Sequence, residues 1–421
     1  MNPDPPASSS AQASSTRRLL AYAGASLIAG GATVTDAENE VRRLGRRLGH
    51  PNVQVSAYPT TLTLALDSGE PATVERIDGG IRLDQSLEVG RIRQDLLEGR
   101  LGIQEGVLAL ANARNKPHLY GPSGFFGGLF LVSMGICLIM QPAWPNVLLA
   151  GLCSLLVSML MRASGRHALL AALLPTLAAF VVSLLVLGAW RMGLVDGPLR
   201  TLICPIAVLL PGALLSTGIA ELATGAVVSG TARFFHGMVQ LLLFALGVVA
   251  AGLLLGVPPS ALVNTRLQEI GLWSLPLGLL LISLGITLSE SVPWQMSLWT
   301  TLVLSCTFAT QLVGQTYGGS LPVGAFCGAV VASFLSTAIE ATRRDVPRLI
   351  TFLPSFWLLV PGTLGLMGIT TIGLGTGHAD AVIAVITLVT SIALGLLVGS
   401  ALALPLKRVA RRMRHLAMLR R

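Results

Sequence analysis

Long apolar runs fill the chain after residue 122, whereas shorter apolar stretches alternate with charged ones before it. A run of roughly twenty apolar residues is long enough for a helix to cross the hydrocarbon core of a membrane. The pattern predicts ten such spans, at 123–140, 144–161, 168–189, 201–222, 235–256, 273–291, 297–315, 319–340, 350–373 and 380–404. The fold class that this indicates is a polytopic α-helical membrane protein.

The residues ahead of the spans predict a small α+β domain over 17–117, behind a Pro/Ser/Ala-rich tail, 1–16, that we expect to be disordered. The apolar stretch at 19–31 lacks a convincing cleavage site, and we interpret it as a helix inside this domain. Thr35 and Glu38 have the spacing of a capping box that would open the next helix. Strands are predicted at 53–57, 62–66 and 73–77, and further helices at about 84–98 and 103–114.

A proline–glycine pair interrupts two of the predicted spans, and the two pairs are 150 positions apart. The sequence LLPG ends at Gly212, and the sequence LVPG ends at Gly362. Residues 128–138 and 278–288, which have the same offset, are identical at seven of eleven positions. Several matches in one register indicate that the membrane part arose by duplication.

Each of the two halves contains five predicted spans. Because five is odd, related halves must insert in opposite orientations, which makes them an inverted-topology pair. The first repeat covers 118–257, with spans one to five, and the second covers 258–406, with spans six to ten. Helix breaks in corresponding places of two inverted repeats are typical of the substrate site of a transporter.

The formal charge of +9 comes entirely from the part of the chain that follows residue 122. Residues 1–122 carry 13 basic and 13 acidic side chains, whereas the remainder carries 16 basic and 7 acidic ones. Ten spans place both termini on one side, and the basic loops favour the cytoplasmic side. Seven basic residues lie in 407–421, which we expect to be a basic cytoplasmic tail beside anionic lipid rather than a nucleic-acid site.

The two helix breaks are also the places where a substrate could bind. A proline removes a backbone donor and opens the helix, and the freed carbonyls are tolerated in a membrane where they face a cavity or other protein. Hydroxyls close to the breaks could bind a small polar substrate, or they could bond back to their own helix. The candidate substrate-binding residues are Pro211, Gly212, Ser216, Thr217, Pro361, Gly362 and Thr363.

Glu221 is one of seven acidic residues after position 122, and it follows Pro211 by ten residues. An ionised carboxylate at membrane depth costs roughly 3 kcal/mol, so it tends to have a partner or to bind a proton. Arg233 follows after a short connection. We interpret Glu221 and Arg233 as candidates for proton coupling or gating, and a purely structural salt bridge between them is the alternative.

A series of short motifs runs through the predicted domain and the membrane part. They are Gly24-Ala25, Gly31-Ala32-Thr33, Asp36, Glu38, Val41, Arg43, Leu48, Pro59-Thr60, Arg76, Pro211-Gly212, Thr217-Gly218, Glu221-Leu222-Ala223-Thr224-Gly225, Ser229-Gly230, Arg233 and Pro361-Gly362. In this order they resemble the threonine/serine exporter family over about 18–405. The resemblance implies a cytoplasmic amino-terminal domain, ten transmembrane helices, and export of threonine and serine driven by the proton gradient.

We therefore expect a multi-pass transporter of the bacterial inner membrane, whose partners are a small amino acid, protons and anionic lipid. A transporter or channel for another small polar solute, such as a dicarboxylate or a peptide, is the first alternative. A membrane sensor with a ligand-binding head is the second. The sequence contains no nucleotide fingerprint, metal-ligand cluster or nucleophile–base pattern that we recognise, so we expect neither an enzyme nor a bound cofactor or metal. The oligomeric state stays open.

Overall fold

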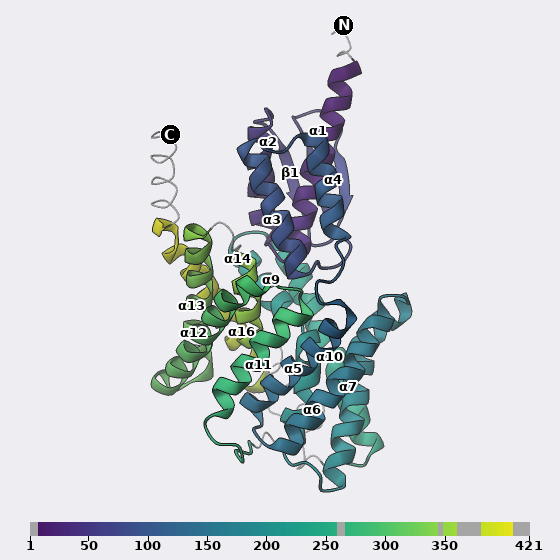
Figure 1. Ribbon diagram of the computed structural model, residues 1–421, viewed down its shortest axis with the longest axis vertical. Helices are drawn as coiled ribbons and strands as arrows, with labels where there is room; N and C mark the ends of the chain where they lie inside the picture. The colour runs from purple at the N-terminus through teal and green to yellow at the C-terminus, as the bar shows by residue number, and fades with distance from the viewer. Residues whose placement is uncertain (1–6, 259–265, 344–347, 360–379, 407–421) are drawn as a thin grey trace. The chain divides into compact units, whose positions relative to one another are not determined.

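The computed structural model describes residues 7–258, 266–343, 348–359 and 380–406, and Figure 1 shows the order of the elements. The chain divides into two compact units. The first unit comprises Met1–Pro117 together with Glu221–Arg233, and the second comprises His118–Ala220 together with Phe234–Arg421. A short segment from the membrane part of the sequence therefore belongs to the first unit.

The first unit combines helices with one small antiparallel sheet. Its elements before residue 118 are α1 (Ala7–Ala29), α2 (Val34–Arg47), β1 (Gln54–Ala57), β2 (Thr61–Ala65), β3 (Thr73–Arg76), α3 (Leu83–Glu98) and α4 (Ile103–Arg114). The strands lie in the order β1-β2-β3, with Gln54 opposite Ala65 and Thr61 opposite Arg76. The three predicted strands and the two predicted helices that follow them are confirmed to within about one or two residues at each end.

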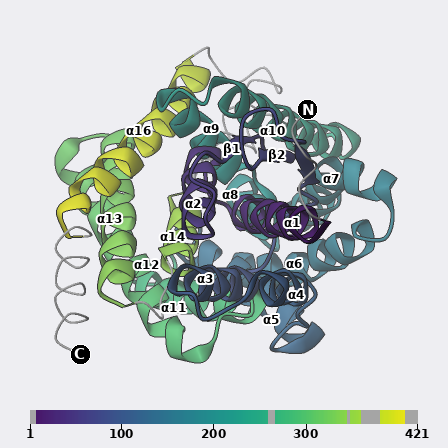
Figure 2. The ribbon, with the colours of Figure 1, turned by 90° about the horizontal axis from the view of Figure 1, so that it is seen from above.

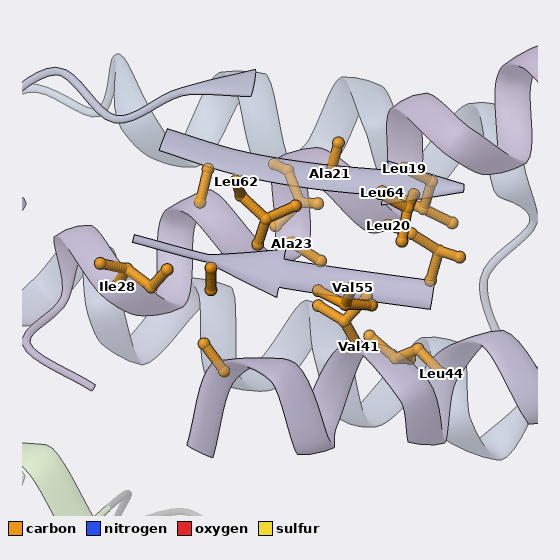
Figure 3. Close-up of a cluster of buried hydrophobic side chains, with 14 of the residues drawn as sticks. Leu19, Leu20, Ala21, Ala23, Ile28, Val41, Leu44, Val55, Leu62 and Leu64 are labelled. Carbon is orange, nitrogen blue, oxygen red and sulfur yellow. The ribbon is translucent and has the colours of Figure 1, made fainter. Parts of the chain in front are cut away.

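Helix α1 lies in the core of this unit. Figure 3 shows Leu19, Leu20, Ala21, Ala23 and Ile28 of α1 meeting buried side chains of α2, β1 and β2. The expectation of a helix after residue 17 is confirmed, whereas the expectation of a disordered tail over 1–16 is wrong for residues 7–16, which form the start of α1. The physical reason is that Ala13 packs against the core and the Thr16 hydroxyl donates to the Gln12 carbonyl.

The start of α2 differs from the predicted capping box. The N-cap residue is Thr33, whose hydroxyl oxygen accepts the Asp36 N–H at 3.1 Å, so the cap stands two residues before Thr35. Glu38 binds elsewhere, because its carboxylate accepts the Ala57 N–H at 3.0 Å and the Arg42 guanidinium at 3.0 Å. Glu38 therefore ties α2 to the end of β1 instead of closing its own helix.

The second unit consists of helices. They are α5 (Gly121–Met140), α6 (Trp144–Ser164), α7 (Ala168–Arg191), α8 (Pro198–Ile206), the 3-10 turn η1 (Ala207–Leu209), α9 (Gly212–Ala223), α10 (Val227–Leu254), α11 (Ser274–Ser289), α12 (Trp294–Gly318), α13 (Leu321–Thr342), α14 (Arg348–Leu358) and α16 (Asp380–Leu402). The last residues of α9 and the first of α10 lie in the segment that joins the first unit.

The described residues contain seven helices long and apolar enough to cross a membrane, and eight if the bent pair Pro198–Leu209 and Gly212–Ala223 is one span. The sixth predicted span corresponds to α11, a shorter apolar helix of 16 residues. The first part of the ninth predicted span, 350–373, corresponds to α14, and its part after residue 359 lies outside the described residues. A polytopic helical membrane protein is thus confirmed.

Helices α5 and α11 cross at glycines, and they lie side by side in Figure 2. A Cβ atom on Gly128 would stand 2.6 Å from the Gly285 carbonyl oxygen, and one on Gly135 would stand 2.6 Å from that of Gly278. The reverse contacts are also close, because a Cβ on Gly285 would meet the Gly128 oxygen at 2.6 Å and one on Gly278 would meet the Gly135 oxygen at 2.8 Å. Only glycine permits two backbones to approach this closely.

The contact between α7 and α10 recurs between α13 and α16. A Cβ on Gly247 of α10 would stand 2.4 Å from the Thr176 carbonyl oxygen and 2.9 Å from Ala179 of α7. A Cβ on Gly395 of α16 would stand 2.6 Å from the Phe326 carbonyl oxygen and 2.8 Å from the side chain of the next turn, that of Ala329. The α13 positions follow the α7 positions by the same 150 residues that separate the sequence matches.

The glycine crossing of α5 and α11 gives a first testable expectation for stability. Replacing Gly285 by Ala pushes a methyl group against backbone atoms of Gly128 and Val132, which cannot rotate away. We expect the purified protein to lose about 1–3 kcal/mol of stability or more, seen as a lower thermal unfolding temperature in detergent. Gly127→Ala is the matched control, because a Cβ there meets nothing within 4 Å. Equal melting of the two variants would contradict the close crossing.

Candidate functional site

The predicted break at Pro211 and Gly212 is confirmed. The chain bends by 63° between Pro198–Leu209 and Gly212–Ala223. Leu210 adopts an extended conformation, with φ −65° and ψ 137°, as expected of a residue before a proline. The helix restarts at once, because the Leu215 N–H donates to the Pro211 carbonyl at 3.1 Å.

The residues of this break are buried. Pro211 and Gly212 lie inside the second unit, and Ser216, one turn into α9, is fully buried. The Ser216 hydroxyl has no hydrogen-bond partner among the described residues, and it does not bond back to its own helix there. Thr217 is half-buried. Pro361, Gly362 and Thr363, the candidates at the second break, lie outside the described residues.

The Glu221–Gly225 motif forms the turn that joins α9 to α10. Gly225 has φ +89°, a left-handed backbone conformation that residues with a side chain rarely adopt and that glycine adopts without strain. The Ala226 N–H donates to the Glu221 carbonyl at 2.9 Å, and the Thr224 hydroxyl donates to the same carbonyl at 3.1 Å. This tight turn sends α10 back past α9, so that Arg233 returns to the level of Glu221.

Glu221 and Arg233 form the ion pair that the sequence suggested. The Arg233 Nε atom lies 3.2 Å from Glu221 Oε2, and the two side chains are 10% and 0% exposed. Neither atom has a hydrogen bond in the described part of the chain, so the pair is a charge contact rather than a directed hydrogen bond. Arg233 can therefore separate from Glu221 without breaking an aligned N–H···O hydrogen bond.

The other carboxylate oxygen has a partner that sequence reasoning missed. Glu221 Oε1 accepts the backbone N–H of Val34, the first residue of α2, at 2.9 Å across 187 positions of sequence. The amino-terminal end of a helix presents free N–H groups and a partial positive charge, which suit a carboxylate. A correct reading of Thr33 as the N-cap would have located these free N–H groups, though not what binds them.

Further contacts hold the Glu221–Arg233 segment within the first unit. The Ser229 hydroxyl donates to the Ala57 carbonyl at 3.4 Å, and Ala226 packs against the hydrophobic core of α1, α2 and the sheet. Through Glu221 in its last turn, the broken helix α9 thus contacts the Arg233 guanidinium and the first backbone N–H of α2. In the described part of the chain, no group of three or more His, Cys, Asp or Glu side chains could hold a metal ion.

Comparison with known proteins assigns the family. Residues 18–255 match the model of the family described as "Putative threonine/serine exporter". No curated protein matches the chain. No solved structure matches it either. The matched region covers more than half of the chain and contains both the break at Pro211 and the Glu221–Arg233 pair. The chain therefore belongs to the threonine/serine exporter family.

Proposed function

We propose that this protein is a secondary transporter that exports threonine and serine across the bacterial inner membrane, driven by the proton gradient. The observation that carries the proposal is the sharp break at Pro211 in a membrane-length helix pair of a chain that belongs to an exporter family. Broken helices whose ends face the protein interior are how transporters bind small polar substrates near the midplane. The buried Ser216 hydroxyl, free of its own helix, is one donor for such a substrate.

We further propose that the ten predicted spans form two inverted five-helix repeats. The α5–α11 contacts support this, because Gly128 meets Gly285 while Gly135 meets Gly278. At the offset of 150 residues, Gly278 corresponds to Gly128 and Gly285 corresponds to Gly135. The second contact is therefore the first contact with the two repeats exchanged, which is what a two-fold axis produces. The residue numbers run in opposite directions along the two helices, so the helices are antiparallel and the axis is perpendicular to them.

In this proposal Glu221 binds a proton or holds Arg233 in only one of the two access states. The support is geometric: the carboxylate is fully buried, it stands at the end of the broken helix, and its contact with Arg233 lacks hydrogen-bond alignment. The Val34 N–H would keep the carboxylate oriented while the charge contact with Arg233 forms and breaks. Substrate movement at the break would then be linked to the protonation of one side chain.

Transport by inverted membrane vesicles tests the proposed function. Because export from a cell is uptake into an inverted vesicle, labelled serine and threonine should accumulate when a proton gradient is imposed. Dissipating the gradient with a protonophore should return the level to simple equilibration. Accumulation of a labelled dicarboxylate or peptide instead of the amino acids would replace the proposed substrate, and binding without any transport would favour a sensor.

The proposed orientation places residues 17–117 and both termini in the cytoplasm. Ser68 lies on an exposed turn after β2 and is suitable for labelling as Ser68→Cys. We expect a membrane-impermeant maleimide to label this variant in permeabilised cells and to leave it unlabelled in intact ones. A buried site, such as a cysteine in place of Ser26, should stay unlabelled in both cases. Labelling of Ser68→Cys from outside would reverse the orientation.

A further inference from the structure

Two corresponding places beside the helix breaks are apolar in the first membrane half and polar in the second. In the first half, Val157 and Met161 of α6 pack with Ala178 of α7 and Leu209 in a single hydrophobic cluster. The residues 150 positions later are Thr307 and Gln311 of α12, Gly328 of α13, and Leu359. Leu209 and Leu359 open the repeated motifs that contain the helix breaks. The second half has therefore exchanged two apolar side chains for polar ones beside its break motif.

Contacts around Gly328 show that these residues lie together in the second unit. A Cβ atom on Gly328 would stand 2.8 Å from Leu359 Cδ2, 3.1 Å from Gln311 Cβ and 3.3 Å from the Thr307 carbonyl oxygen. Thr307 and Gln311 are one helical turn apart, so both side chains lie on the same face of α12. Glycine at 328, where the first half has Ala178, lets Leu359 and α12 pack directly against the backbone of α13.

The polar atoms of this pair have no partner. Thr307 is fully buried, and neither its hydroxyl nor Gln311 Oε1 has a hydrogen bond in the part of the chain that the structure describes. The other threonines of α12 all bond back to the carbonyl four residues earlier; they are Thr300, Thr301, Thr310 and Thr316. Thr307 is thus an exception within its own helix.

Buried polar atoms without partners are unfavourable, so their presence calls for an explanation. An apolar pair at these places is compatible with the fold, because the first half has one. Both residues contact Gly328, which also packs against Leu359 of the break motif, where the proposed function puts a small polar substrate. A ligand that supplies the missing hydrogen bonds explains both the polarity and the lack of internal partners.

Resting on the proposed function, we propose that Thr307 and Gln311 bind the side-chain hydroxyl of the substrate and select hydroxylated amino acids. A hydroxyl donates to the Gln311 oxygen and accepts from the Thr307 hydroxyl, so it satisfies both atoms at once. The pair carries no charge, which suits a neutral hydroxyl better than an ammonium or a carboxylate, since a buried charge needs a counter-charge.

The test uses the full chain in proteoliposomes with labelled L-threonine, and it compares L-serine with L-alanine as competitors. In the native protein we expect L-serine, which has the hydroxyl, to compete at the lower concentration. The double variant Thr307→Val, Gln311→Met restores the apolar pair of the first half. We expect it to reduce the preference for serine over alanine by about tenfold or more, since the site loses its hydrogen bonds to the hydroxyl. Thr307→Ser, which keeps a hydroxyl, should keep most of the preference.

Thr310→Val is the matched control. It removes a hydroxyl from the same helix, but this hydroxyl already donates to the Cys306 carbonyl of that helix. An unchanged preference in the double variant overturns the inference, and so does an equal loss in the control. A lower melting temperature of the double variant would assign the two side chains a structural role and also overturn it. If the native protein does not transport threonine, the proposed function itself fails and takes this inference with it.

Discussion

Replacing Glu221 by glutamine is expected to abolish threonine accumulation driven by the proton gradient while leaving exchange of labelled for unlabelled threonine in place. Glutamine keeps the carbonyl oxygen that accepts the Val34 N–H, so the contact with α2 survives. It cannot bind and release a proton, and it places a neutral group opposite Arg233. Exchange requires no net proton movement, which is why the two assays separate coupling from substrate binding.

The experiment compares both assays in the same vesicles, at equal amounts of protein. Glu269→Gln is the control, because Glu269 is an exposed acid between α10 and α11 and its neutralisation should leave both activities unchanged. Loss of exchange together with accumulation would indicate that Glu221 maintains the structure of the protein. Retention of both activities, with normal expression, would exclude either role for Glu221.

The second large effect is expected on stability, from replacing Arg233 by alanine. This change leaves the fully buried Glu221 carboxylate without its counter-charge, and removing one partner of a buried ion pair costs about 3–5 kcal/mol. We expect a correspondingly lower unfolding temperature in detergent. Combining it with Glu221→Gln should recover much of the loss, because no buried charge remains and the Val34 N–H keeps an acceptor.

An exposed ion pair of the same unit provides the control. Arg76 lies 2.9 Å from Asp78, closer than Arg233 lies to Glu221, but the two side chains are 83% and 70% exposed. Solvent screens such a pair, so Arg76→Ala should cost less than about 1 kcal/mol. If Arg233→Ala were equally mild, burial of the Glu221–Arg233 pair would not matter to the fold.

Local patterns predicted the elements of this protein well, because they depend on nearby residues. The alternation of Leu62 and Leu64 with threonines marked β2, and apolar runs marked the helices that can span a membrane. Pro211 predicted the break in its helix pair, since a proline acts on its own backbone and on the residue before it. The scarcity of acids after residue 122 singled out Glu221, and Arg233 was its nearest basic side chain.

Boundaries and partners were decided by tertiary packing. Residues 7–16 are helical because Ala13 packs against the core, a contact that composition does not reveal. The predicted capping box of Thr35 and Glu38 does not form, because the Glu38 carboxylate binds the Ala57 N–H at the end of β1. Both corrections come from contacts with distant parts of the chain, which override a weak local preference.

The residue pattern alone was enough to identify a helical membrane protein with a proline break and to single out the acid that follows this break. What that acid binds depends on the fold, because the Val34 N–H is 187 positions away and nothing in the local sequence pairs Glu221 with the start of α2. The same holds for Thr307, whose hydroxyl lacks the bond that every other threonine of α12 makes. Residue type tells which hydrogen bonds a side chain can make, and three-dimensional packing decides which of them are made.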